Sequence, residues 1–326
     1  MKLLAMLCAV AFGLGLQGSQ TAYGADAYPS RLLRIICPYP AGGASDILSR
    51  AIAQELGKEL HVSVIVENRP GSGSTIGSEA GARAEPDGYT LTMTSSPLFA
   101  VVPEIYPKLS YDPRKAFDSV IVLASFANVL VVNPKVKAHT VKELIDLAKA
   151  HPGALSYAST GYGSTVHLSA EMFKSMAGGL DIVHVPYKGS PPAVTDLLAG
   201  QVQLMFNNLP NVLGQIKSGQ LRALAVTGAK REPELPNIPT MIEAGLPGYE
   251  AVGWFSLSVP HGTPPQIVAK LNGAAIKGLR SPEFIQRMKA LSFQIVGGTP
   301  AQMDKMIDDE VERWGPVIKA SGAKVD

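Results

Sequence analysis

The pattern of apolar and polar positions predicts a chain in which short buried strands alternate with amphipathic helices. Apolar runs at 34–37, 62–66, 155–158 and 181–185 have the length of buried strands. Each is followed by a loop and then by apolar residues at helical spacing, and further strands are expected at 89–93, 201–206, 222–226 and 254–259. The alternation predicts parallel sheets in a doubly wound α/β pattern.

Two extended apolar runs, 120–124 and 128–133, follow one another without a helical stretch between them. Such a pair is expected where the chain crosses from one domain to another. A chain of 326 residues also exceeds the usual size of a single core. We therefore predict one domain from 28–127 and 228–326, closed by helices at 265–279, 282–291 and 300–319, and a second domain from 128–227.

The loop that follows the first strand is rich in glycine and begins a helix. Gly42 and Gly43 allow a tight turn, and a hydroxyl or carboxylate can cap the helix that follows. Unpaired N–H groups at such a helix start favour an anion above the loop, although an ordinary turn has the same composition. The candidate ligand-binding residues here are Tyr39, Ala41, Gly42, Gly43, Ser45 and Asp46.

The same arrangement recurs after the strand at 155–158. Its candidates are Ser159, Thr160, Gly163, Ser164, Thr165 and His167. A histidine on a helix face is more often packed in place than used as a ligand, and we favour that role for His167. Ser95, Ser96 and Asn207 end two further strands, where open sheets bind ligands, although turn and capping chemistry explains such residues equally well.

The N-terminus has the features of a secretory signal peptide. Met1-Lys2 precedes a continuous apolar run at 3–16 and a polar stretch, so we expect 1–27 to be removed and the protein to reach the periplasm. The run is too short for a membrane anchor. Cleavage also removes Cys8 and leaves Cys37 as the single thiol, so no intramolecular disulfide can form.

Composition and motifs argue against several other functions. The net charge is +2 without a basic patch, so neither nucleic acid nor a membrane surface is an expected partner. The six histidines are scattered, no P-loop or Gly-x-Ser-x-Gly motif occurs, and Ile76 replaces the last glycine of a dinucleotide fingerprint. We therefore expect no metal, no cofactor and no enzymatic activity. The pattern favours a receptor that closes on an anion, with an exported hydrolase as a remote alternative.

Several ordered motifs resemble one known family over nearly the whole mature chain. The matching segments are Pro38–Asp46, Glu67–Gly73, Pro86–Leu91, Gly161–Leu168, Val185–Gly189 and Asp196–Val202. Together they resemble the substrate-binding receptors of tripartite tricarboxylate transporters, the Bug family. This resemblance implies a type II periplasmic binding protein fold, in which two α/β domains joined by crossing strands close like a Venus flytrap.

The resemblance also implies a function. Receptors of this family bind small di- or tricarboxylates, acidic amino acids or aromatic acids, with one loop at each end of the ligand. They deliver the ligand to permease subunits in the membrane, and some serve a signalling sensor instead. We expect a monomer. The family commonly has aspartate where this chain has Asn207, so we predict preference for a carboxylate that lacks an amino group.

Overall fold

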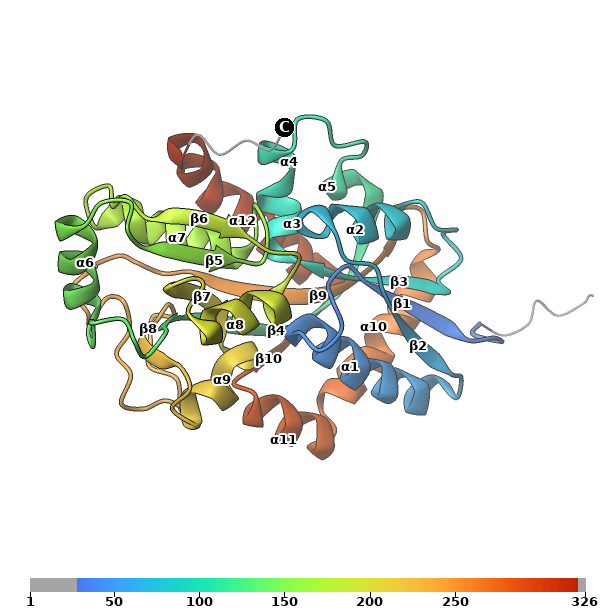
Figure 1. Cartoon of the computed structure of the whole chain (residues 1–326). Coiled ribbons are helices and arrows are strands. Elements are labelled where there is room, and N and C mark those ends of the chain that lie inside the picture. The colour runs from blue at the N-terminus through green and yellow to red at the C-terminus, as the bar shows by residue number, and fades with distance from the viewer. Residues whose placement is uncertain (1–27, 322–326) are drawn as a thin grey trace, which may run out of the picture.

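The computed structural model describes residues 28–321 (Figure 1). The predicted signal peptide, 1–27, lies outside the described residues. Within 28–321, no helix is long and apolar enough to cross a membrane.

The strands of the described chain form one curled sheet with the order β2-β1-β3-β9-β4-β7-β5-β6, and β10 and β8 also pair with β4. The sheet has two halves, which correspond to the two lobes in Figure 1. The strands are β1 (Leu33–Cys37), β2 (Val64–Asn68), β3 (Thr90–Ser95), β4 (Phe117–Val132), β5 (Ser156–Ser159), β6 (Val183–Pro186), β7 (Leu204–Asn208), β8 (Arg222–Val226), β9 (Val252–Pro260) and β10 (Gln294–Gly297).

Helices cover both faces of the first half. Leu48 and Ile52 of α1 share one core cluster with Leu271 of α10 and Met288 of α11, whereas α3 and α12 pack on the other face beside Trp254. The helices of this half are α1 (Ala44–Leu60), α2 (Thr75–Ala82), α3 (Ser96–Ala100), α4 (Val102–Ile105), α5 (Pro113–Ala116), α10 (Pro265–Leu279), α11 (Pro282–Ala290) and α12 (Pro300–Ser321), and a 3₁₀ turn lies at Ser72–Ser74.

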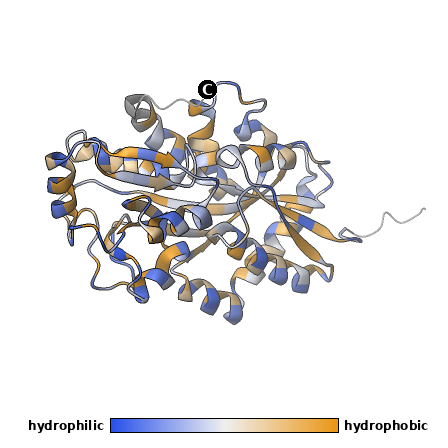
Figure 2. Cartoon of the chain, in the orientation of Figure 1, coloured by the Kyte–Doolittle hydropathy of each residue, from blue (hydrophilic) through white to orange (hydrophobic). Residues whose placement is uncertain are grey.

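The second half repeats the three-layer arrangement. Leu144 of α6 and Phe173 of α7 pack on one face of its strands, and Leu197 of α8 and Val212 of α9 pack on the other. The helices are α6 (Val141–Ala150), α7 (Thr165–Met176), α8 (Ser190–Ala199) and α9 (Leu209–Lys217). Apolar residues gather along the strands and on the inner sides of the helices, and polar residues face outward (Figure 2). The predicted two-part α/β fold is confirmed.

The two extended runs predicted at 120–124 and 128–133 are one strand, so the expectation of two was wrong. The intervening residues Ser125 to Ala127 stay extended because they pair with Trp254 to Val252 of β9. Up to Ala127, β4 pairs with β9, and from Asn128 it pairs with β7 and β8. One unbroken strand therefore belongs to both halves of the sheet.

Three other expectations require correction. The sheet is mixed, because β9 runs antiparallel to both β3 and β4. Helix α9 was not predicted, although its Pro210 lies in the first helical turn, where proline is well tolerated. Strand β10 was also missed because it is short and partly exposed and pairs only with β4.

The segment before β9 packs with the second half of the sheet. Met241, Leu246 and Tyr249 lie in the same core cluster as Leu130 and Phe206. Tyr249 also donates a hydrogen bond to the Ser169 carbonyl of α7 at 2.6 Å. This packing favours a second crossing near residue 251 rather than 228, and the division into domains stays a prediction.

Candidate functional site

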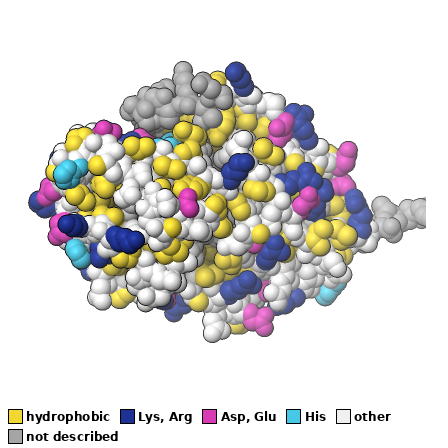
Figure 3. Space-filling model, in the orientation of Figure 1, with side chains coloured by type: hydrophobic (Ala, Val, Ile, Leu, Met, Phe, Trp, Pro, Cys, Tyr) yellow, Lys and Arg dark blue, Asp and Glu magenta, His cyan; other side chains and the backbone are white. Residues whose placement is uncertain are grey.

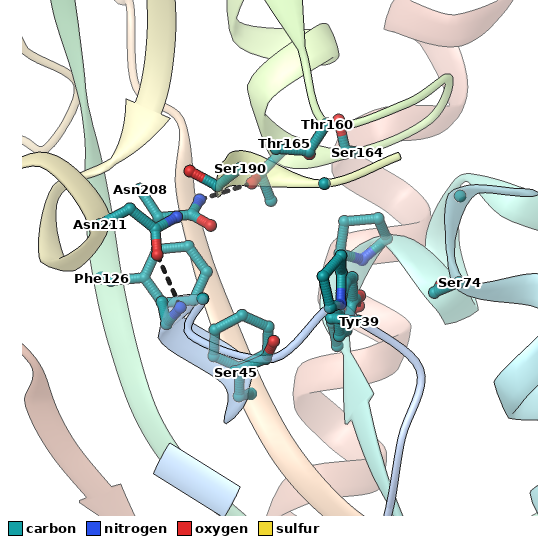
Figure 4. A pocket seen from close by; sticks show the side chains of 18 of the residues that line it. Tyr39, Ser45, Ser74, Phe126, Thr160, Ser164, Thr165, Ser190, Asn208 and Asn211 are labelled. Carbon is teal, nitrogen blue, oxygen red and sulfur yellow. Dashed lines mark hydrogen bonds between the residues drawn. The ribbon is translucent and has the colours of Figure 1, made fainter. Parts of the chain in front are cut away.

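A small pocket lies between the two halves, where the loops of both meet (Figure 4). Its solvent-accessible volume is about 50 Å³, room for roughly three to five water molecules. The first half and the crossing strands contribute Tyr39, Pro40, Gly43, Ala44, Ser45, Gly73, Ser74, Ser95, Pro97, Phe126 and Phe255, and the second half contributes Thr160, Ser164, Thr165, Gly189, Ser190, Pro191, Asn208 and Asn211.

Six helices begin at this pocket, three from each half. The N-cap residues of all six line it: Gly43, Ser74 and Ser95 for α1, α2 and α3, and Ser164, Gly189 and Asn208 for α7, α8 and α9. Only the N-cap of α7 accepts a side-chain cap hydrogen bond. The positive ends of the helix dipoles and several unpaired N–H groups therefore meet in one small volume.

The pocket wall carries no acidic or basic side chain among the described lining residues. Burial raises the pKa of the Tyr39 phenol, so its hydroxyl stays protonated. The positive potential in the pocket therefore comes from backbone N–H groups, and the pocket is suited to an anion.

An aromatic surface forms one side of the pocket. The rings of Phe126 and Phe255 lie 4.7 Å apart, and Tyr39 meets Phe255 edge-on at 5.9 Å. The Tyr39 hydroxyl is hydrogen-bonded to Ser95 Oγ at 2.8 Å, which fixes the ring. This surface can pack against the carbon chain of a ligand whose charged groups face the helix starts.

Asp46 lies behind the first loop, outside the pocket lining. Its carboxylate accepts hydrogen bonds from the Gly42 N–H at 2.9 Å, from Asn68 at 2.9 Å and from Arg50 at 3.1 Å. Burial alone would raise the pKa of Asp46, but these hydrogen bonds outweigh burial and hold it below its ordinary value. Asp46 thus fixes the shape of the loop.

His167 has a corresponding place behind the second loop. Its Nδ1 accepts the Gly163 N–H at 3.3 Å, and its backbone N–H donates to Ser164 Oγ. Ser159 is fully buried. Its Oγ accepts the Gly161 N–H at 3.1 Å and is hydrogen-bonded to His184 Nε2 at 2.7 Å. These side chains hold the glycine turn in position.

The amide at the end of β7 that lines the pocket belongs to Asn208. Its Nδ2 donates to Asn128 Oδ1 at 2.7 Å and to Thr165 Oγ1 at 3.1 Å. Asn207 is fully buried and bonds to Ser190 and Asn211 behind the wall. Successive residues of a strand point to opposite faces, so Asn208 lines the pocket while its neighbour Asn207 points away from it.

The predicted site residues therefore divide into two groups. Those that line the pocket are Tyr39, Gly43, Ser45, Ser95, Thr160, Ser164 and Thr165, and those outside the lining are Ala41, Gly42, Asp46, Ser96, Ser159, Gly163, His167 and Asn207. Sequence reasoning missed the aromatic pair, Ser74, Ser190, Asn208 and Asn211. Asn208 and Asn211 belong to the start of α9, and recognition of that helix would have pointed to them.

A second, more open cavity adjoins the pocket and contains a basic side chain. Its accessible volume is about 310 Å³, and its wall includes Tyr106, Tyr162, Tyr187 and Lys188. The two cavities share six wall residues: Tyr39, Pro40, Gly73, Ser74, Thr160 and Gly189. Lys188 is therefore placed to attract an anion toward the pocket without contacting it there.

Gly73 of the first half lies very close to the second half. A Cβ atom at this position would lie 2.7 Å from the Tyr162 carbonyl oxygen of the second half, and 2.8 Å from the Tyr106 hydroxyl. Gly73 also has a φ of +61°. No residue with a side chain fits there while the halves are this close.

Comparison with known proteins identifies similar receptors. Residues 48–323 match the family described as tripartite tricarboxylate transporter family receptor. Protein BugT of Bordetella pertussis (strain Tohama I) is 38% identical over 327 residues, which covers 100% of both chains.

Two solved structures with named acids are similar throughout. R. palustris Rpa4515 with adipate is 37% identical with a TM-score of 0.88 and covers 91% of this chain and 100% of its own. MatC (Rpa3494) from Rhodopseudomonas palustris with bound malate is 30% identical with a TM-score of 0.85. The match covers 89% of this chain and 100% of the MatC chain.

Replacing Gly73 by alanine should keep the halves apart, because the new Cβ atom collides with the Tyr162 carbonyl. Small-angle X-ray scattering should give a larger radius of gyration than for the unmodified protein. Gly42→Ala is the matched control, since Gly42 also has a positive φ, +81°, but a Cβ there meets nothing within 4 Å. Both variants should lose a similar unfolding free energy, about 1–2 kcal/mol. Equal radii for the two variants would contradict the close-contact interpretation.

Stability should fall as pH decreases from about 6.5, because burial lowers the pKa of His167 to about 4 and that of His184 to about 3. Unfolded histidine titrates near 6.5, so the unfolded chain binds more protons in this window. The loss between pH 6.5 and 5 should be on the order of 1 kcal/mol per histidine. Urea unfolding should show a shallower pH slope for His184→Gln, with the exposed His151→Gln as control. An unchanged slope in His184→Gln would exclude this contribution.

Proposed function

The chain belongs to the tripartite tricarboxylate transporter receptor family, and from this premise we propose that it is a periplasmic solute receptor for a small carboxylate. The observation that carries the proposal is the meeting of six helix N-termini at a pocket without charged side chains. The receptor closes on its ligand and delivers it, as a monomer, to a tripartite tricarboxylate-type membrane transporter. Export by the N-terminal segment is part of the proposal.

The proposed mechanism uses both halves of the pocket. The starts of α1 and α7 contribute N–H groups from opposite sides, so a ligand with two acidic groups satisfies donors on both domains at once. A hydrogen bond to a charged group contributes about 1.5–3 kcal/mol, so three to five of them are enough for micromolar affinity, about 8 kcal/mol. Only a ligand that spans the gap gains all of them, and this difference drives closure.

The preferred ligand carries no amino group. An ammonium group in this pocket would find no carboxylate on the described wall, because the residue at the end of β7 is the amide Asn208. Burying an unpaired cation is costly. The adipate and malate named for the two similar structures lack amino groups and are reasonable first probes.

The hydroxyl groups near the pocket do not form a hydrolytic site. Ser164 Oγ donates to the Gly161 carbonyl at 2.8 Å, and Ser95 Oγ bonds to Tyr39, so neither has a base as its partner. Ser159 does contact a histidine, His184, but it is fully buried and lines neither cavity. We therefore propose a binding function and no reaction.

The surface also agrees with a small-molecule ligand. On the face shown in Figure 3, acidic and basic side chains lie interspersed among neutral and hydrophobic ones. Such a surface offers no extended basic footprint for a polyanion.

A thermal-shift series tests the ligand class. Adipate, malate, citrate, benzoate and aspartate are added to the protein, and a dicarboxylate at about a hundred times its dissociation constant should stabilise by roughly 2.7 kcal/mol. Aspartate should give a smaller shift than malate. Asn208→Asp serves as the matched variant, because a carboxylate there repels an acid and can pair with an ammonium group. In this variant the thermal shifts with malate and with aspartate should therefore differ less than in the unmodified protein. A larger shift with aspartate than with malate would contradict the ligand class, and no shift with any acid would contradict the function.

Thr160→Val should weaken binding of the stabilising acid about 10- to 100-fold, as expected for one hydrogen bond to a charged group. The Thr160 hydroxyl lines the pocket and has no hydrogen-bond partner among the described residues, and valine keeps its shape. Calorimetric titration measures the affinity. Ser164→Ala is the comparison, since it removes the cap of α7 and should lower stability as well. Unchanged affinity in Thr160→Val would remove Thr160 from the site.

A further inference from the structure

The first helix is capped from the other side of the pocket. Its N-cap residue, Gly43, has no side chain to accept an N–H of the first turn. Instead, the Ala44 N–H donates to Asn211 Oδ1 at 2.6 Å, and Asn211 lies in α9 of the second half (Figure 4). The two residues are 167 positions apart in the chain. A contact that normally is local to a helix therefore joins the two halves.

The orientation of the Asn211 amide is fixed by its second hydrogen bond. Asn211 Nδ2 donates to Asn207 Oδ1 at 3.0 Å, and Asn207 Nδ2 donates to Ser190 Oγ at 2.8 Å. Asn207 Nδ2 also contacts Met205 Sδ at 3.5 Å, an atom that can only accept, so Asn207 Oδ1 is the atom presented to Asn211. The oxygen of Asn211 is thereby turned toward α1, where it meets the Ala44 N–H.

We propose that Asn211 is a positioning residue for ligand capture, which caps α1 across the pocket when the halves close. This role rests on the proposed function, in which closure holds the ligand. Asn211 satisfies the first N–H of α1, and the N–H groups of Ser45 and Asp46, which have no acceptor inside the helix, face the ligand. The cap thus aligns the start of α1 for the ligand without contacting the ligand's charge.

The cap contributes to closure because it exists only when the halves are together. Loss of a helix cap corresponds to a change of about 2- to 30-fold in an equilibrium constant. Removing Asn211 should therefore lower the closed-to-open ratio by this factor. The same factor should appear mainly as faster ligand dissociation, since opening precedes release.

Asn208 provides a matched control. It is also an asparagine in the pocket wall, three residues before Asn211, but its side chain bonds to Asn128 and Thr165 rather than to α1. Asn208→Ala removes an amide of the same size without removing the contact between α9 and α1.

The experiment measures amide exchange at Ala44 by NMR together with the radius of gyration by small-angle scattering, without added acid. Asn211→Ala should speed exchange at Ala44 about 2- to 30-fold relative to unmodified protein and increase the radius, and Asn208→Ala should do neither. The thermal unfolding midpoint of each variant shows that it is folded.

Each outcome bears on the proposal. Faster exchange with a larger radius in Asn211→Ala alone supports it. Equal exchange in Asn211→Ala and the unmodified protein would refute the cap, and faster exchange without a change in radius would refute its link to closure. Since no acid is present, either failure leaves the proposed carboxylate binding to be judged separately by the thermal-shift series.

Discussion

The unpaired N–H groups at the start of a helix must find acceptors, and this requirement organises the whole site. Parallel strands that lead into helices place every helix start at the same edge of a sheet. Here two such edges face one another, and three helices begin at each. The donors do not need charged side chains beside them, because the helix dipoles already favour an anion. Charged side chains would also add a cost of desolvation each time the halves close.

Small residues in the wall follow from the same requirement. A backbone N–H can reach a ligand only where side chains leave it exposed, and the pocket wall accordingly contains glycine, alanine, serine and threonine at the helix starts. If these loops were flexible, ordering them on binding would cost free energy and would weaken the affinity for the ligand. Asp46 and His167 meet this need from behind the wall, where each accepts a loop N–H, from Gly42 and Gly163. Their polar atoms hold the donors in position and leave the pocket neutral.

The sequence predicted the contiguous parts of this arrangement well and the long-range parts poorly. Both glycine loops were recognisable because strand, turn and helix follow one another within a dozen residues. Phe126, Phe255 and Asn211 reach the pocket only through the pairing of β4 with β9 and the packing of α9, which no local pattern encodes. Sequence reasoning named Asn207, whereas Asn208 lines the pocket, for another reason. Strand ends are uncertain by a residue or two, and one residue decides which side chain faces the pocket.

In the proposed mechanism, the crossing strand explains how the site can open and close and still bring the same groups together. β4 is continuous through Ala127 and Asn128, so the two halves are joined by a strand that can bend and not by a loose linker. Motion about such a strand is restricted in direction, and it brings the same surfaces together each time. Gly73 and Tyr162 then meet at a distance that only glycine permits, and the Ala44 N–H meets the Asn211 amide. In the proposed mechanism, contacts between protein atoms therefore stabilise the closed state together with contacts to the ligand. Because both sets of contacts use N–H donors of α1, the proposal implies that domain closure and ligand binding stabilise one another.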